Sequence, residues 1–258
     1  MGIRSAIYSW LQRGTPAAIP APRRRMYEGA KVSRLTSDWV TAGTSADAEI
    51  KGSLARLRNR SRQLVRDNDY ARQAIRAVRN NVIGTGIRMQ SQVRMQRGGG
   101  RLDQMVNDAI ENAWATWGRK DSCHTAGRLS FPDIERLVVG SMAESGEVFV
   151  RMVRQPFGRS KIPFALEIIE SDLLDDTYTG GSTVEGNEWR MGVELDRWGR
   201  PVRYAFLTKH PGDSGVGGTP VGAARHRFIA ADEVLHLYLM DRPGQTRGVP
   251  MLASAIQR

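Results

Sequence analysis

The sequence predicts an α+β protein in which an N-terminal helical segment is followed by a β-rich region. In residues 51–145, apolar side chains recur every three or four positions, which is the period of a helix face. In residues 146–240, short apolar or alternating runs end at glycine and proline turns, which is typical of strands. Because no strand–helix–strand series appears, we expect helices and sheets to occupy separate parts of the fold.

Residues 1–50 are predicted to form a flexible basic N-terminal arm. The segment is rich in Pro, Ser, Thr, Gly and Ala and offers few side chains for burial. It contains the run Arg23, Arg24 and Arg25, which could contact phosphate or could simply keep the arm solvated.

Two helices joined at a turn are predicted between residues 53 and 82. Ser53 is placed to cap the first helix, and Asn68 or Asp69 to cap the second. The first helix carries an apolar stripe and several arginines that could follow DNA phosphates or pair with carboxylates of a neighbouring subunit. The stripe comprises Leu54, Leu57, Arg58, Ser61 and Leu64, and the arginines are Arg56, Arg58, Arg60, Arg62 and Arg66.

The remainder of the mainly helical region holds one predicted strand and two further helices. Residues 87–93 alternate as a half-buried strand does, and a helix is expected from Leu102 to Trp117. A last helix should begin at Ser130, with Asp133 completing its cap. Its buried stripe is expected to comprise Leu137, Val138 and Met142.

The β-rich region ends in a turn that is followed by the start of a helix. Strands are predicted at 147–153, 162–169, 193–195, 202–207 and 234–240, with turns at 180–181, 197–200 and 211–222. In residues 241–258, Pro243-Gly244 predicts a turn and Pro250 a first helical position. No residue that commonly closes a helix follows, so we expect the chain to be the N-terminal portion of a longer protein.

Charge is distributed unevenly along the 258 residues. The chain carries a net charge of +11, and residues 1–100 hold 19 Lys and Arg against 6 Asp and Glu. A basic half suggests an anionic partner, either nucleic acid or an acidic protein surface. The single cysteine, Cys123, excludes an internal disulfide framework. No apolar run approaches the roughly 18 residues that span a bilayer, so no membrane partner is expected.

Candidate catalytic and metal motifs lack their usual context. Ser214 lies in the tetrapeptide found around a trypsin-type nucleophile, but neither His124 nor Asp172 has the flanking pattern of a triad partner. Cysteine and histidine are not spaced as zinc ligands, and the acidic residues between 167 and 176 fit a solvated strand edge. We expect no enzyme, cofactor or metal, with a serine hydrolase at Ser214 as a weaker alternative.

Several stretches together resemble the lambda-type portal proteins of tailed bacteriophages. The N-terminal ones are Leu57-Arg-Asn-Arg-Ser-Arg-Gln-Leu64, Asn68-x-Tyr-Ala71 and Asn81-x-x-Gly-Thr-Gly-Ile87. The later ones are 146–150, 170–173, 198–201, 210–213 and 241–250, in the order in which the family has them. The resemblance covers roughly residues 50–258.

This resemblance implies a subunit comprising the wing and part of the stem or clip of a portal ring. Such a ring, usually of twelve subunits, lies at one capsid vertex and lets double-stranded DNA enter and leave. The implied partners are further copies of the chain, DNA, the terminase large subunit, and head-completion, scaffold and major capsid proteins. The expected location is the virion, and the bacterial host cytoplasm during assembly. A basic nucleic-acid-binding module is the main alternative.

Overall fold

The structure is a computed structural model that describes residues 27–95, 99–213 and 225–256. The chain consists of two units, Met1–Gly43 and Thr44–Arg258. In the first unit, the 3-10 helix η1 (Glu28–Ala30) precedes a turn at residues 34–38. This turn is held locally, because the Thr36 hydroxyl donates to the Lys31 carbonyl at 3.0 Å and accepts from the Ser33 amide at 2.9 Å.

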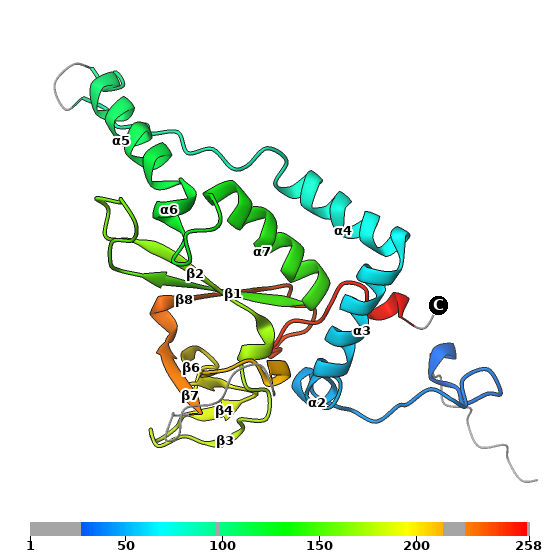
Figure 1. Cartoon of the computed structure of the whole chain (residues 1–258). Helices are drawn as coiled ribbons and strands as arrows, with labels where there is room; N and C mark the ends of the chain where they lie inside the picture. The colour runs from blue at the N-terminus through cyan, green and yellow to red at the C-terminus, as the bar shows by residue number, and fades with distance from the viewer. Residues whose placement is uncertain (1–26, 96–98, 214–224, 257–258) are drawn as a thin grey trace, which may run out of the picture. The chain divides into compact units, whose positions relative to one another are not determined.

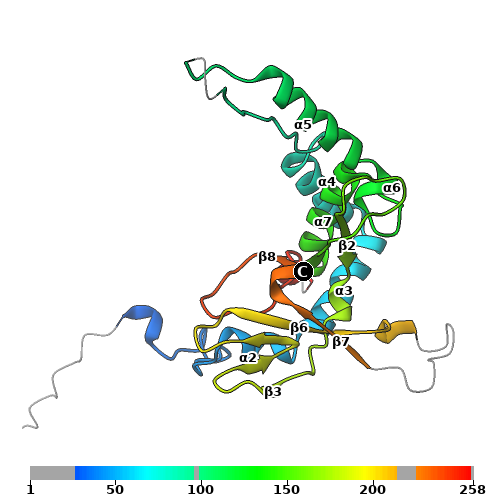
Figure 2. The same ribbon diagram turned by 90° about the vertical axis from the view of Figure 1, so that its left-hand side faces the viewer.

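Helices dominate the first hundred residues of the second unit, as predicted. They are α2 (Ala46–Lys51), α3 (Leu54–Asp67), α4 (Asp69–Val82), α5 (Gln104–Trp117), α6 (Lys120–Cys123) and α7 (Phe131–Ser145). Figure 1 shows α3, α4 and α7 side by side, whereas α5 extends away from both sheets in Figures 1 and 2. Among the helices of the described residues, none is both long and apolar enough to cross a membrane.

Two of the three predicted helix caps are confirmed. The Asn68 side chain accepts from the amides of Tyr70 and Ala71, and Ser130 forms a reciprocal capping box with Asp133. The cap at Ser53 was predicted wrongly, because its side chain makes no capping hydrogen bond. The stripe of α7 was only partly predicted: Val138 packs against the core, but Leu137 is 40% exposed, and the buried side chains are Ile134, Val139 and Ala143.

Residues 87–93 do not form the predicted strand. Instead, α5 satisfies the backbone of this segment with a side chain: Asn107 accepts from the Val93 amide at 2.8 Å and donates to the Val93 carbonyl at 3.1 Å. The Glu111 carboxylate accepts the Ser91 amide in the same way, at 2.9 Å. The segment is therefore extended along a helix rather than paired with a neighbouring strand.

Two antiparallel sheets follow the helices. One has the order β2 (Ala165–Ile169), β1 (Glu147–Val153), β8 (Val234–Tyr238). The other has the order β3 (Gly180–Gly181), β4 (Glu188–Arg190), β5 (Val193–Leu195), β6 (Pro201–Leu207), β7 (His226–Ala230). Short 3-10 helices lie at Ser171–Leu173 (η2), Pro211–Asp213 (η3) and Ala231–Glu233 (η4). The α+β class is thus confirmed.

The strands β1 and β5 were predicted at their observed bounds, and β6 was predicted to within one residue. β2 and β8 are shorter than expected, while β4 and β7 were not predicted, and the turn expected at Gly180-Gly181 is the short strand β3. The hairpin between β5 and β6 is confirmed, with Gly199 at a φ of 76°. Of the glycine-rich turn at 211–222, residues 214–222 lie outside the described residues.

The central strand β1 divides the core into two halves because its side chains alternate. Phe149 packs with Leu174, Tyr204 and Phe206 on the side of the five-stranded sheet. Val150 packs with Trp117 and other apolar residues on the side of α7. Trp117, which is buried, and Trp114, which is partly buried, both belong to this second half of the core.

The segment after β8 crosses the junction of α7 and β1, where Gly248 approaches Gly146 closely. The turn at Pro243-Gly244 is confirmed, with Gly244 at a φ of 79°. The helix predicted to start at Pro250 is of the 3-10 type within the described residues: a turn and the 3-10 helix η5 (Ala253–Ala255) follow. The Met251 amide instead donates to the Ala143 carbonyl at 3.0 Å, which ties the segment to the end of α7.

This crossing requires a glycine in each of the two segments that meet, Gly146 after α7 and Gly248 after β8. A Cβ at Gly248 would lie 2.1 Å from the Gly146 carbonyl oxygen, and one at Gly146 would lie 2.6 Å from the Val249 carbonyl carbon. Gly146 also has a φ of 93°, which disfavours other residues. The two backbones therefore touch without intervening side chains.

We predict that Gly248→Ala lowers the free energy of unfolding by more than about 2 kcal/mol, because a clash with backbone cannot be relieved by a rotamer change. Urea denaturation followed by circular dichroism measures the loss. Gly52→Ala is the matched control, since Gly52 has a helical φ of −80° and no atom lies within 4 Å of the position of its Cβ. Equal midpoints for the two variants would contradict the packing described.

Candidate functional site

Glu147, the first residue of β1, is the centre of a fully buried polar cluster. Its carboxylate accepts from Arg247 Nη2 at 2.6 Å, from Arg247 Nε at 2.9 Å and from Arg58 Nη2 at 3.1 Å. The Gly248 amide donates to Oε2 at 3.0 Å, and His236 Nε2 lies 2.9 Å from the same oxygen. One carboxylate thus joins α3, β1, β8 and the segment after β8.

Arg247 extends the cluster to the second sheet. Its Nη1 donates to the Met191 carbonyl at 2.7 Å, and its Nη2 also donates to the Ser171 carbonyl at 3.3 Å. Met191 lies at the turn between β4 and β5 and has a φ of 48°, the only positive φ of a non-glycine residue in the described chain. The guanidinium therefore holds a turn whose backbone conformation is unfavourable for methionine.

A second carboxylate, Asp172, pairs with two arginines of α3. Arg58 Nη1 lies 3.4 Å and Arg62 Nη2 2.5 Å from its oxygens, and Arg62 also reaches Glu170 at 2.9 Å. Asp172 was expected on a solvated edge, but only 13% of its side chain is exposed. Ion pairs with α3 account for this burial.

Burial and the paired charges move the pKa values of this cluster in opposite directions. Burial alone would raise the pKa of Glu147, but the Arg247 guanidinium, and then His236, holds it well below its usual range. The same competition, with Arg58 and Arg62 as the cations, lowers the pKa of Asp172. Burial lowers the pKa of His236, so the ring is neutral at pH 7 and donates its Nε2 hydrogen to Glu147.

The arginines predicted to contact DNA or another subunit fall into three groups. Arg58 is fully buried and Arg62 half-buried, and both bind carboxylates of their own chain, so the expectation that Arg58 contacts an outside partner is corrected. Arg56 and Arg60 are exposed on α3 and have no carboxylate partner within the described part of the chain, whereas Arg66 pairs with Asp67. Arg23, Arg24 and Arg25 lie outside the described residues.

Comparison with known proteins gives two agreeing results. The family model described as "Phage portal protein, lambda family" matches residues 32–258. The chain belongs to this family. It is also 33% identical over 256 residues to a protein named "Probable portal protein" of Halomonas phage phiHAP-1, and the match covers 95% of this chain. The chain spans about half of that relative, since the match covers 48% of the relative's length.

Four of the eight stretches that identified the portal family in the sequence meet at the buried cluster. Arg58 comes from 57–64, Gly146 and Glu147 from 146–150, and Asp172 from 170–173. Arg247 and Gly248 come from 241–250. The motifs were recognised in the sequence, but the partnership of Glu147 and Arg247 was missed. Two sequence features could have indicated this pair: Glu147 precedes a strand-forming apolar run, and Arg247 lies between Gly244 and Gly248.

Other acidic groups considered in the sequence also have cationic partners. Glu167 binds Arg151 and Arg227, and Asp175 binds His226 at 2.8 Å. Glu170, Asp172 and His210 lie close enough to share a metal ion, but Arg62 already binds both carboxylates. The Arg62 guanidinium therefore supplies the positive charge that pairs with these two carboxylates.

The groups considered for a serine hydrolase have other partners or are not described. Ser214 lies outside the described residues. His124 Nδ1 accepts the amides of Arg128 and Leu129, each at 3.2 Å, so this atom is engaged with backbone. Asp172 binds the two α3 arginines, as described above. The described geometry therefore gives no support to pairing His124 with Asp172.

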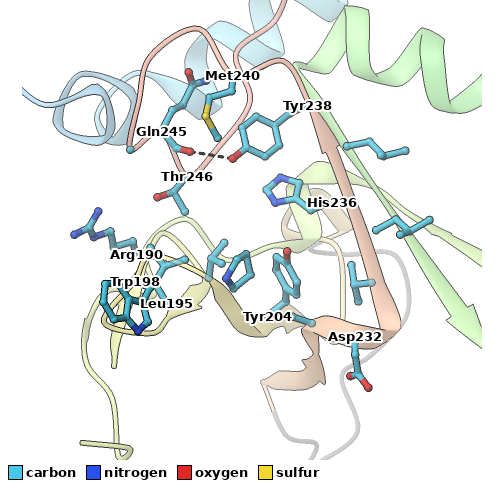
Figure 3. A pocket seen from close by; sticks show the side chains of 18 residues that line it. Arg190, Leu195, Trp198, Tyr204, Asp232, His236, Tyr238, Met240, Gln245 and Thr246 are labelled. Carbon is cyan, nitrogen blue, oxygen red and sulfur yellow. Dashed lines mark hydrogen bonds between the residues drawn. The ribbon is translucent and has the colours of Figure 1, made fainter. Parts of the chain in front are cut away.

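An open pocket lies between β8, the segment that follows it, and the β5–β6 hairpin (Figure 3). Its volume is about 710 Å³. Apolar side chains form most of the wall, and Tyr204, His236 and Tyr238 supply aromatic surface. The Tyr238 hydroxyl donates to the Gln245 carbonyl at 2.9 Å, so the segment that carries Arg247 also forms one edge of the pocket.

We predict that part of the loss of stability between pH 7 and pH 5.5 comes from His236. The pKa of His236 is below 6.5 in the folded chain, so on acidification the unfolded chain takes up a proton that the folded chain does not. Stability from this group is thus fully present above pH 6.5 and falls by at most about 1.4 kcal/mol per pH unit below it. Glu147, whose pKa is depressed, adds a further loss below about pH 4.5.

His236→Gln keeps a donor for Glu147 but cannot titrate, so its unfolding free energy should decline less between pH 7 and pH 5.5. Urea denaturation at both pH values measures the difference. His210→Gln, at a half-exposed ring outside the buried cluster, controls for the substitution itself. An equal decline in the His236 variant and the unsubstituted chain would rule out this contribution.

Proposed function

We propose that this chain is the N-terminal part of a portal subunit that forms a ring at one capsid vertex. Double-stranded DNA would be packaged and ejected through the ring, and the terminase large subunit would dock there before head-completion proteins. Scaffold and major capsid proteins are the neighbours during assembly in the bacterial host cytoplasm, and the virion is the final location. The match of the portal family model over residues 32–258 carries this proposal.

The described structure supports a structural rather than a catalytic role. The side chains of Glu147, Arg247 and Arg58 are between 0% and 3% exposed, and the two arginines hold the two sheets and α3 together. A buried side chain that is paired within its own chain stabilises the fold and is not available to a substrate. We propose that the chain works without a cofactor and not as an enzyme.

A closed ring requires two different surfaces on each subunit that fit each other. Arg56 and Arg60 on α3 are candidates for one of them, because their guanidinium groups are exposed and lack carboxylate partners in the described chain. We propose that they pair with carboxylates of the neighbouring subunit. In this arrangement the two arginines contribute to assembly of the ring rather than to recognition of a DNA sequence.

The assembly is tested by electron microscopy and native mass spectrometry of the chain at the full length in which it is encoded. We expect rings of one subunit number, usually twelve in this family as the resemblance implies. Arg56→Ala combined with Arg60→Ala should reduce the ring fraction several-fold, whereas Arg66→Ala should leave it unchanged. A monomer at high protein concentration would count against the ring.

The same two exposed arginines favour a second candidate function, a basic nucleic-acid-binding module. In that case an isolated monomer would bind DNA with an affinity that falls steeply with salt, because each arginine–phosphate contact releases counterions. Fluorescence anisotropy with a duplex at several salt concentrations distinguishes the two functions. Loss of salt-dependent binding in the Arg56/Arg60 double variant, with rings absent throughout, would favour the module.

A further inference from the structure

A tyrosine hydroxyl without a partner among the described residues faces the pocket beside β8. Tyr204, on β6, is only 2% exposed, and its hydroxyl has no hydrogen-bond partner among the described residues. Figure 3 shows this hydroxyl directed into the space between His236, Tyr238 and the hairpin side chains. A hydroxyl that faces an open pocket can hydrogen-bond to water, or to a ligand group that takes the place of this water.

The remaining surface of this pocket, here the Tyr204 pocket, is suited to an apolar or aromatic group. Its walls include Val193, Leu195, Val234 and Leu237. Trp198 and Met240, which also line it, are 75% and 61% exposed. Large apolar side chains gathered around an open cavity commonly mark an interaction site.

The first unit of the same chain presents the complementary kind of surface. In the described segment 27–43, the side chains of Tyr27, Val32, Leu35, Trp39 and Val40 are between 75% and 91% exposed. Leu35 lies in the turn at residues 34–38 and Trp39 directly follows this turn, which is fixed by the Thr36 hydrogen bonds. A segment this short cannot bury five large apolar side chains against itself, so it needs an apolar surface elsewhere.

We propose that segment 27–43 of one subunit docks on a second copy of this chain, with Trp39 inserted into the Tyr204 pocket. The indole ring would cover the apolar wall, and its N–H would donate to the Tyr204 hydroxyl oxygen. This inference rests on the proposed function, because it names one pair of unlike surfaces that a ring requires. The pocket is large enough to admit Leu35 or Val40 beside the indole.

Charge supports a second copy rather than a strongly charged partner. Segment 27–43 carries Glu28 and Asp38 against Lys31 and Arg34, so its formal charge is zero. The charged residues that line the pocket are Arg190 and Asp232, and Arg190 already pairs with Glu188 and Asp47. The segment of one copy and the pocket of another are both apolar and without excess charge, so they can pack together without nucleic acid or an acidic protein.

The test is cross-linking between two separately purified single variants, Thr41→Cys and Asp232→Cys. Thr41 is exposed two residues after Trp39, and Asp232 is an exposed residue of the pocket lining, so both anchors stay intact. Cys123 can remain, because burial raises its pKa to about 11 and keeps the thiol unreactive near neutral pH. A flexible bismaleimide added to the mixture can join the two variants only across two chains.

We expect at least ten-fold more covalent heterodimer than with the control pair Thr41→Cys and Tyr70→Cys, since Tyr70 is also exposed and lies on α4, away from the pocket lining. Adding Trp39→Ala to the Thr41 variant, or Tyr204→Phe to the Asp232 variant, should lower the yield at least several-fold. Melting temperatures identify any variant whose yield falls because it unfolds. The substitution of Trp39 lies in the separate first unit and leaves the pocket unchanged.

The outcomes separate this inference from the proposed function. Rings without the specific heterodimer would overturn the docking of segment 27–43 and leave the portal ring standing. In a further variant that carries both Thr41→Cys and Asp232→Cys on one chain, cross-linking that occurs only within the monomer would likewise overturn docking on a second copy. A monomer that forms neither rings nor heterodimer would overturn both.

Discussion

The ion pair between Arg247 and Glu147 is the interaction on which the rest of the structure depends. Both side chains are fully buried, and the guanidinium donates to the carboxylate with two of its nitrogens. Removing one partner of such a pair leaves an uncompensated buried charge, which costs about 3–5 kcal/mol. Here the cost would be distributed over both sheets and α3, because Arg58, Met191 and Ser171 all bind the same two side chains.

This constraint explains the backbone features around it. Arg247 reaches Glu147 because Gly146 and Gly248 allow two backbone segments of the chain to touch. The Gly248 amide then completes the hydrogen bonds of the carboxylate. The Tyr204 pocket lies on the other side of the same segment, where Gln245 binds Tyr238. A rigid body of this kind can present fixed surfaces to neighbouring subunits, which is what the assembly we propose requires.

The sequence predicted those parts of the fold that depend on local patterns. The stripe on α3, the Asn68 cap and β1 all follow from residues close together in the chain. Strands of two or three residues, such as β3 and β4, are too short to show alternation, and residues 87–93 alternate but pair with α5. Arg58 was placed on the correct face, yet its partner lies 89 residues away, and that of Arg247 lies 100 residues away. Separations of this size leave no local signal, so buried arginines were taken for contacts with DNA or another subunit.

A double-mutant cycle on Glu147→Gln and Arg247→Met tests the central role of this pair most directly. The free energies of unfolding of the two single variants and the double variant are measured by urea denaturation at pH 7. Each single substitution should cost several kcal/mol, and the double variant should lose at least about 2 kcal/mol less than the sum, because no unpaired charge then remains from this pair. Costs that add to within about 0.5 kcal/mol would contradict the account, since independent sites behave in that way.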